Sequence, residues 1–286
     1  MAEQQDWRGD DLSDVLDLKS LLIPAKKALR RNPLSLLISD PTGEEEGWQE
    51  KYGRDEEGNL IVTDPKEREQ NFKHWFGDSK VVDKGGKPLA MYHGTQKGGF
   101  SEFDVYGSSK HGLFGSGGYF TEDPEVASGY ADKTSPKAES KSPAVYRVHL
   151  SIKNPIDMDA PANKSNWAKV LEDFGYSPDE YETLRKQNAT NEAVFKEVED
   201  DLEAEGVPMS EGSELIQDML RGMGHDGITH MGGGRANKKS EKRHRVYIIF
   251  DPTQAKSVNN RGLYNPANPD ILSKRVNPKK SLKIPA

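Results

Sequence analysis

The chain has 286 residues, of which 33% are hydrophobic and 30% are charged, so it is long enough for one sizeable domain with appendages. Because the sequence contains no cysteine, disulfides, thiolate zinc sites and a cysteine nucleophile are excluded. The net charge of -7 is unevenly distributed: residues 1–234 carry -17, whereas residues 235–286 carry +10.

Residues 1–60 are expected to form an N-terminal helical arm followed by an acidic linker. Apolar and charged residues alternate on a helical period over residues 11–31, which predicts a helix that docks on a partner or packs against its own domain. Residues 39–59 are acidic, polar and spaced by glycine, which is typical of a linker. No apolar run approaches the roughly 20 residues of a membrane span, and no signal peptide is recognisable, so we expect a cytoplasmic protein.

The main domain is expected at residues 61–275, and it begins with a clear helix signal. Asp64 is suited to cap a helix, Pro65 to occupy its first turn, and Gly77 to end it. Short strands follow, separated by a mostly helical, acidic insertion, and a basic disordered tail closes the chain. The predicted strands lie within 81–95, where a glycine turn separates two of them, and at 144–152, 227–231 and 246–251; the insertion spans about 162–222, and the tail spans 276–286.

Glycines crowd the stretch that precedes Tyr119. Seven glycines lie between positions 98 and 118, too many for a packed strand or helix, so they predict a loop whose backbone comes close to something. Tyr119 then ends a strand, and Asp123 and Pro124 start a helix that carries Tyr130 two turns later. The two tyrosine rings are thus placed to face each other across a slot that suits a flat aromatic ring.

These residues carry a resemblance to a known family. The strings YHGT at 92–95 and FGSGGYF at 114–120, together with Tyr130, resemble the NAD-binding signature of ADP-ribosyltransferases of the diphtheria-toxin and poly(ADP-ribose) polymerase type. Residues 72–272 are similar to the ADP-ribosyltransferase-like domains of phage and prophage polyvalent proteins. The resemblance implies an α+β fold with two small antiparallel sheets around an NAD cleft, and NAD as the substrate.

The resemblance also implies a role for each matching residue. His93 would hydrogen-bond the ribose hydroxyls of NAD, the backbone of Gly94 would hold the nicotinamide carboxamide, and Thr95 would support the turn. Tyr119 and Tyr130 would sandwich the nicotinamide ring. The expected cofactor-binding set is His93, Gly94, Thr95, Tyr119, Phe120 and Tyr130, and the expected catalytic set is His93, Tyr119 and Tyr130.

One part of the family pattern is missing. Relatives of the polymerase type carry a glutamate directly before the strand that resembles VYIIFD, and this sequence has Val246 there. Three explanations stay open. The enzyme transfers a single ADP-ribose and relies on an acid of its substrate, or Glu241, Asp226 or Gln254 takes over the role, or the fold has lost catalysis. Polymer formation is not expected.

No metal site is expected, because His225, His230 and His244 lie in or beside strands without a cluster of further ligands. The glycine run at 231–235 resembles a phosphate cradle but does not lead into a helix, so it is interpreted as a target-recognition loop. The lysines and arginines that follow favour an acidic protein surface or a nucleic acid.

We therefore expect a mono-ADP-ribosyltransferase that moves ADP-ribose from NAD to a macromolecular target. The expected target is a host protein modified in the host cytoplasm during phage infection, with nucleic acid as the alternative. The competing hypothesis is a catalytically degenerate NAD-binding or virion protein of the same fold, which uses the arm and the basic tail as its contacts.

Overall fold

The computed structural model describes residues 52–54, 60–106, 112–132, 142–233 and 243–273. The predicted helical arm and the predicted basic tail lie outside these residues, as does Glu241. The limits proposed for the main domain therefore stay a prediction, and the structure concerns what lies between them.

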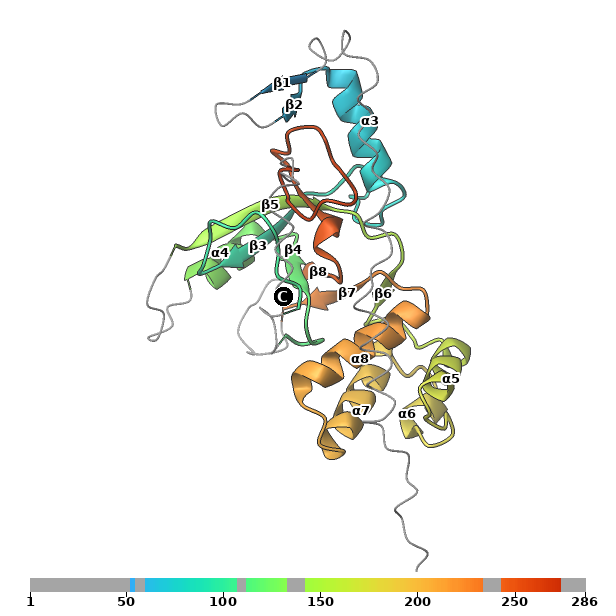
Figure 1. Cartoon of the computed structure of the whole chain (residues 1–286). Coiled ribbons are helices and arrows are strands. Elements are labelled where there is room, and N and C mark those ends of the chain that lie inside the picture. The colour runs from blue at the N-terminus through green and yellow to red at the C-terminus, as the bar shows by residue number, and fades with distance from the viewer. Residues whose placement is uncertain (1–51, 55–59, 107–111, 133–141, 234–242, 274–286) are drawn as a thin grey trace, which may run out of the picture. The chain divides into compact units, whose positions relative to one another are not determined.

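Strands of the described chain form one sheet of seven in the order β6-β7-β8-β4-β3-β5-β9 and a separate pair, β1-β2 (Figure 1). Neighbouring strands are antiparallel except β6 and β7, which are parallel. The strands are β1 (Tyr52–Arg54), β2 (Leu60–Val62), β3 (Met91–Thr95), β4 (Gly118–Thr121), β5 (Ala144–Leu150), β6 (Pro155–Asp157), β7 (Gly227–Gly232), β8 (His244–Ile249) and β9 (Ala255–Ser257).

Helices flank the sheet, and most of them lie in the predicted insertion (Figure 1). Helix α4 packs on β3, while α7 and α8 pack on each other. The α-helices are α3 (Pro65–Phe76), α4 (Pro124–Asp132), α5 (Lys164–Asp173), α6 (Glu182–Arg185), α7 (Asn191–Ala204) and α8 (Met209–Gly222), and a 3-10 turn spans Pro252–Gln254.

The sheet consists of two halves that are joined at a single residue pair. Strand β3 stays paired with β5 from Met91 to Thr95, but it meets β4 only where Tyr92 lies opposite Thr121. The α+β class is therefore confirmed. The two expected small sheets are the halves β6-β7-β8-β4 and β3-β5-β9 of one sheet, and the β6-β7 pair departs from the antiparallel expectation.

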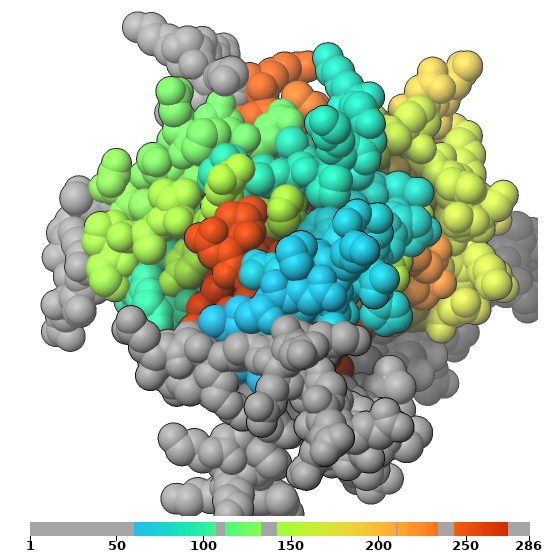
Figure 2. Space-filling model, turned by 90° about the horizontal axis from the view of Figure 1, so that it is seen from above, coloured from blue at the N-terminus to red at the C-terminus, as the bar shows by residue number. Residues whose placement is uncertain are grey.

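Helix α3 forms as its local sequence predicts. The Asp64 carboxylate accepts a hydrogen bond from the Lys66 amide (2.9 Å), and Gly77 leaves the helix with a φ of 56°. Its aromatic face packs on the C-terminal part of the described chain, where the ring of Phe72 lies 5.1 Å from that of Tyr264. Figure 2 shows the blue atoms of α3 beside the red atoms of the later segment.

The strand pair predicted within residues 81–95 is wrong in its first member. Val82 and Pro88 form only an isolated bridge, and the second strand is β3. The Asp83 carboxylate accepts hydrogen bonds from the amides of Gly85 (2.8 Å) and Lys87 (2.9 Å). Because the side chain satisfies these amides, the segment closes as a tight turn instead of extending as a ladder.

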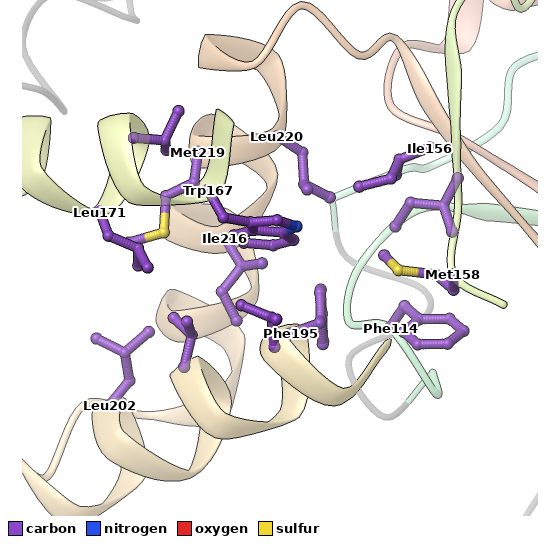
Figure 3. Close-up of a cluster of buried hydrophobic side chains, with 14 of the residues drawn as sticks. Phe114, Ile156, Met158, Trp167, Leu171, Phe195, Leu202, Ile216, Met219 and Leu220 are labelled. Atoms are coloured by element: carbon purple, nitrogen blue, oxygen red, sulfur yellow. The ribbon is translucent and has the colours of Figure 1, made fainter. Parts of the chain in front are cut away.

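Two hydrophobic clusters lie on opposite sides of β8. Val246, Ile248 and Phe250 belong to the cluster that contains the helices of the insertion, whereas Ile249 belongs to the cluster around β3, β5 and β9. This alternation is what a central strand covered on both faces requires. Figure 3 shows the first cluster, in which Trp167 of α5 and Ile216 of α8 meet Phe195 of α7. The insertion thus shares its core with the sheet.

A buried lysine ties β9 to the segment that follows it. Lys256 is fully buried, and its ammonium donates hydrogen bonds to the carbonyl oxygens of Asn268 and Asp270. Burial lowers the pKa of this lysine from 10.5 to about 8, although carboxylates such as Asp270 partly oppose the shift. The fold therefore holds a cation whose charge is costly to bury.

We expect the free energy of unfolding to rise with pH because of Lys256. Below about pH 8 the lysine is charged in both states, while between about pH 8 and pH 10 the unfolded chain binds more protons than the folded chain. The expected gain is on the order of 2 kcal/mol over this interval. Urea unfolding followed by tryptophan fluorescence measures it, and Lys256→Met, which cannot titrate, is expected to flatten the slope. An unchanged slope in Lys256→Met contradicts the assignment.

Candidate functional site

The candidate site begins where β3 and β4 separate. One residue past the last pair of this ladder, His93 Nδ1 lies 2.8 Å from the main-chain oxygen of Tyr119. A carbonyl oxygen only accepts hydrogen bonds, so Nδ1 carries the proton and Nε2 is the acceptor of the neutral ring. The imidazole thus takes the place of a ladder bond, and the structure brings together two of the predicted site residues.

The surroundings of His93 keep its ring neutral. The ring is half-buried beside Phe103 and Phe120, at centroid distances of 5.1 and 5.5 Å. Burial lowers the pKa of His93 below its ordinary value of 6.5, and the hydrogen bond to the Tyr119 carbonyl offsets this only in part. A neutral ring with Nδ1 engaged offers Nε2 as an acceptor, which is the group that a sugar hydroxyl needs.

Gly94 is required by the close packing of α4. A Cβ atom at this position would lie 1.7 Å from the main-chain oxygen of Ala127. The next residue, Thr95, accepts a hydrogen bond from the Lys97 amide through its hydroxyl (3.2 Å), and its role in the NAD site stays a prediction. Because β4 pairs with β3 only at Tyr92, the β4-facing edge of Gly94 and Thr95 lies outside the strand ladder.

Tyr119 is anchored by its hydroxyl to the glycine-rich loop. The phenol oxygen accepts a hydrogen bond from the Phe114 amide (3.1 Å) and donates one to the Gly115 carbonyl (2.8 Å). Burial raises the pKa of the Tyr119 phenol, and the nearby Glu199 carboxylate and Tyr130 raise it further. The hydroxyl is therefore neutral and bonded to the loop, while the partly buried Tyr119 side chain packs against the first hydrophobic cluster.

The glycines of this loop have a structural explanation within the protein. A Cβ atom on Gly112 would lie 2.3 Å from the Tyr119 hydroxyl, and one on Gly115 would lie 2.5 Å from the Cβ of Ser213. The sequence predicts that another group approaches the backbone of this loop closely. In the structure these groups are side chains of the protein itself, those of Tyr119 and Ser213. This loop is shaped by Tyr119 and by α8.

The two remaining aromatic residues of the predicted site differ in exposure. Tyr130 on α4 is 56% exposed, whereas Phe120 is 1% exposed inside the second hydrophobic cluster. The Tyr130 hydroxyl adds to the raised pKa of the Tyr119 phenol. The nicotinamide sandwich stays a prediction, and the Phe120 side chain contributes to the cluster beneath His93.

The position of the missing glutamate is apolar. Val246 is buried in the first hydrophobic cluster, and its strand neighbours are Thr121 on β4 and His230 on β7. Two of the suggested replacements are engaged elsewhere. The Asp226 carboxylate accepts hydrogen bonds from the amides of residues 153 (2.7 Å) and 154 (2.8 Å), and the Gln254 side-chain oxygen accepts from those of residues 250 (3.0 Å) and 251 (2.9 Å).

The remaining sequence predictions concern a metal site and a target-recognition loop. Among the residues that the structure describes, no group of three or more histidine, aspartate or glutamate side chains is arranged to hold a metal ion. His230 and His244 are buried strand residues, and the ring of His230 lies 5.0 Å from that of Phe114. Of the basic run expected to recognise a target, residues 234–242 lie outside the described chain, while Arg245 pairs with Asp157 (3.5 Å).

None of the helices in the described ranges combines the length and the apolar character that a membrane crossing requires.

Two residues of the insertion reach the glycine-rich loop and were not predicted: Gln217 bonds to the Ser116 carbonyl, and Lys196 to the Leu113 carbonyl (2.9 Å). Only the crowd of glycines signalled such close neighbours, and it did not identify them.

Comparison with known proteins places this arrangement in context. A family model described as ADP-Ribosyltransferase in polyvalent proteins matches residues 83–263, a range that contains His93, Tyr119 and Tyr130. The matched range covers more than half of the chain. No curated protein and no solved structure matches.

Gly94→Ala is expected to destabilise the domain because the new methyl group would overlap the Ala127 carbonyl and push α4 away from β3. Overpacking of this kind costs about 1–3 kcal/mol. Gly129→Ala, within helix α4, is the control. Nothing lies within 4 Å of its Cβ position, so this variant should stabilise α4 by about 0.5–1 kcal/mol. Urea unfolding of both variants decides, and a neutral Gly94→Ala would show that α4 is free to shift.

The His93 ring is expected to be neutral with its proton on Nδ1 at pH 6.5 and to titrate only below that value, because burial disfavours the charged form. Histidine nitrogen NMR of the labelled protein measures the tautomer and the pKa, and His93→Gln assigns the signal. The unfolded chain takes up this proton first as pH falls, so the domain also loses stability below about pH 6.5. A pKa at or above 6.5 contradicts this environment.

Proposed function

The chain belongs to the ADP-ribosyltransferase family of polyvalent proteins, and on this premise we propose that it transfers a single ADP-ribose from NAD to a macromolecular target. The observation that carries the proposal is the bond from His93 Nδ1 to the Tyr119 carbonyl (2.8 Å) at the point where β3 and β4 separate. It links His93 on β3 to Tyr119 on β4 across the junction of the two sheet halves, and Tyr130 is exposed on α4, which packs on β3.

The residues of the site suit the binding of a nicotinamide riboside unit. His93 would accept a hydrogen bond from a ribose hydroxyl at Nε2. The backbone of Gly94 and Thr95 would face the carboxamide with the strand edge that does not pair with β4. The rings of Tyr119 and Tyr130 would hold the flat pyridinium between them.

The reaction needs little besides this positioning. The bond between the ribose anomeric carbon and the pyridinium nitrogen breaks, and its electron pair leaves with nicotinamide, which cancels the ring's positive charge. A lone pair of the target nucleophile forms the new bond to the anomeric carbon, and the nucleophile's proton passes to solvent or to a base of the target. Holding NAD in a reactive pose lowers the barrier to this step by fixing geometry in advance.

The proposed product is a single ADP-ribose unit. Chain extension in polymerase-type relatives depends on a glutamate that activates the incoming hydroxyl, and this position holds the buried Val246. The target we propose is an acidic protein surface, in line with the basic residues that precede and begin β8. A host protein modified during phage infection fits this description.

A second candidate function is supported by the same position. With Val246 buried and the side chains of Asp226 and Gln254 bonded to main-chain amides, the described chain offers no free replacement for the glutamate among the groups considered. The alternative is a protein of this fold that binds NAD without cleaving it and acts through its contacts with other proteins.

Incubation of the full chain with NAD and a cell lysate tests the proposal. We expect nicotinamide release and a target that gains one ADP-ribose by mass spectrometry. Both should fall by about 100-fold or more in His93→Ala and in Tyr119→Ala, because the sugar and the ring lose their positioning contacts. His225→Ala is the matched control, since His225 Nδ1 also lies 3.0 Å from a main-chain oxygen, that of Asn154, outside the candidate site.

The other outcomes separate the competing functions. Nicotinamide release without a labelled target indicates an NAD glycohydrolase and contradicts transfer. Binding of NAD without nicotinamide release supports the second candidate. A chain that neither binds nor cleaves NAD contradicts both, and labelling of nucleic acid in place of protein corrects the class of target.

A further inference from the structure

We propose that the helical insertion positions Tyr119 for the nicotinamide ring, with Gln217 of α8 as the main positioning residue. The inference rests on the proposed NAD site, and it assigns to α7 and α8 a function beyond packing on the sheet. Three sets of contacts carry it: those of Tyr119 with the loop 112–117, those of α8 with the loop, and those of α7 with the loop.

Tyr119 depends on the loop for its orientation. Its hydroxyl both accepts from the Phe114 amide and donates to the Gly115 carbonyl, so the phenol is held at two points. These two bonds fix the position of the hydroxyl end of the ring. A shift of the loop therefore moves the tyrosine ring, because the strand fixes only the other end of the side chain.

Helix α8 holds the centre of this loop. Gln217 is 2% exposed, and its side-chain nitrogen donates a hydrogen bond to the carbonyl of Ser116, which is itself 1% exposed. One turn earlier, Ser213 approaches Gly115 so closely that a Cβ on the glycine would lie 2.5 Å from the serine Cβ. An amide donor at position 217 is thus the polar partner of a buried carbonyl two residues before the strand that carries Tyr119.

Helix α7 holds the start of the loop. Phe114 is fully buried with its ring 5.3 Å from that of Phe195 in an edge-to-face contact, and Figure 3 shows Phe114 on the sheet side of the helical cluster. Next to it, the Lys196 ammonium donates to the Leu113 carbonyl (2.9 Å) and pairs with Glu199. Two helices of the insertion, α7 and α8, therefore bond to the loop, as does the Tyr119 hydroxyl.

Gln217→Met tests the role, because it keeps the length of the side chain and removes the donor. The Ser116 carbonyl would then be buried without this bond, and we expect the loop to open more often. Hydrogen exchange of the loop amides should accelerate by about tenfold. The Phe114 amide is the most direct reporter, since it donates to the Tyr119 hydroxyl.

The same variant should change NAD kinetics in a defined way. A less well positioned ring weakens the clamp on nicotinamide, so KM for NAD should rise about tenfold while kcat changes less. Lys196→Met is a second test variant at a partly exposed position, because the lysine side chain is 36% exposed. It should show the same pattern with a smaller amplitude.

Ser213→Ala is the matched control on the same helix. Its hydroxyl donates to the Met209 carbonyl within α8 (2.8 Å), and alanine keeps the Cβ contact with Gly115. This variant should leave loop exchange and KM within twofold of the wild-type protein. Equal effects of Gln217→Met and Ser213→Ala, or unchanged loop exchange in Gln217→Met, overturn the positioning role.

The exchange experiment needs no NAD, which separates the two proposals. If the wild-type chain fails to bind NAD, the proposed function fails, whereas the exchange data still report whether Gln217 holds the loop and Tyr119. Faster loop exchange with an unchanged KM would mean that the insertion anchors the loop but does not position the ring for NAD, and this outcome overturns the inference alone.

Discussion

The hydrogen bond from His93 to the Tyr119 carbonyl is the interaction on which the candidate site depends. It bridges the two halves of the sheet just beyond their single paired position, Tyr92 and Thr121. Strands that separate leave main-chain groups to be satisfied, and here a side chain satisfies one of them. The His93 side chain therefore joins β3 to β4, and the proposed function assigns its Nε2 to a ribose hydroxyl.

Close approach within the protein explains most of the glycines around the site. Gly94 admits the carbonyl of Ala127, Gly112 admits the Tyr119 hydroxyl, and Gly115 admits Ser213. A glycine in a binding motif is commonly explained by the close approach of a ligand. At each of these three positions, however, neighbouring protein atoms already leave no room for a larger side chain.

The insertion and the strands behave as one unit. Its helices share a hydrophobic cluster with Val246 and Ile248 of β8, and they hold the loop that orients Tyr119. The apolar character of position 246 follows from this arrangement, since a carboxylate there would lie in the cluster that the insertion closes.

Local chemistry determined what the sequence alone could predict. The capped helix that begins at Pro65, the alternating strands β5 and β8, and the ordered motifs around His93, Tyr119 and Tyr130 depend on residues a few positions apart, so their patterns are readable in the chain. Tertiary structure alone decided that Gln217 would meet Ser116 across 101 residues, that α4 would cover Gly94, and that Asp226 and Gln254 would bond to main-chain amides. Such contacts depend on how distant segments pack, and no short stretch of sequence records that.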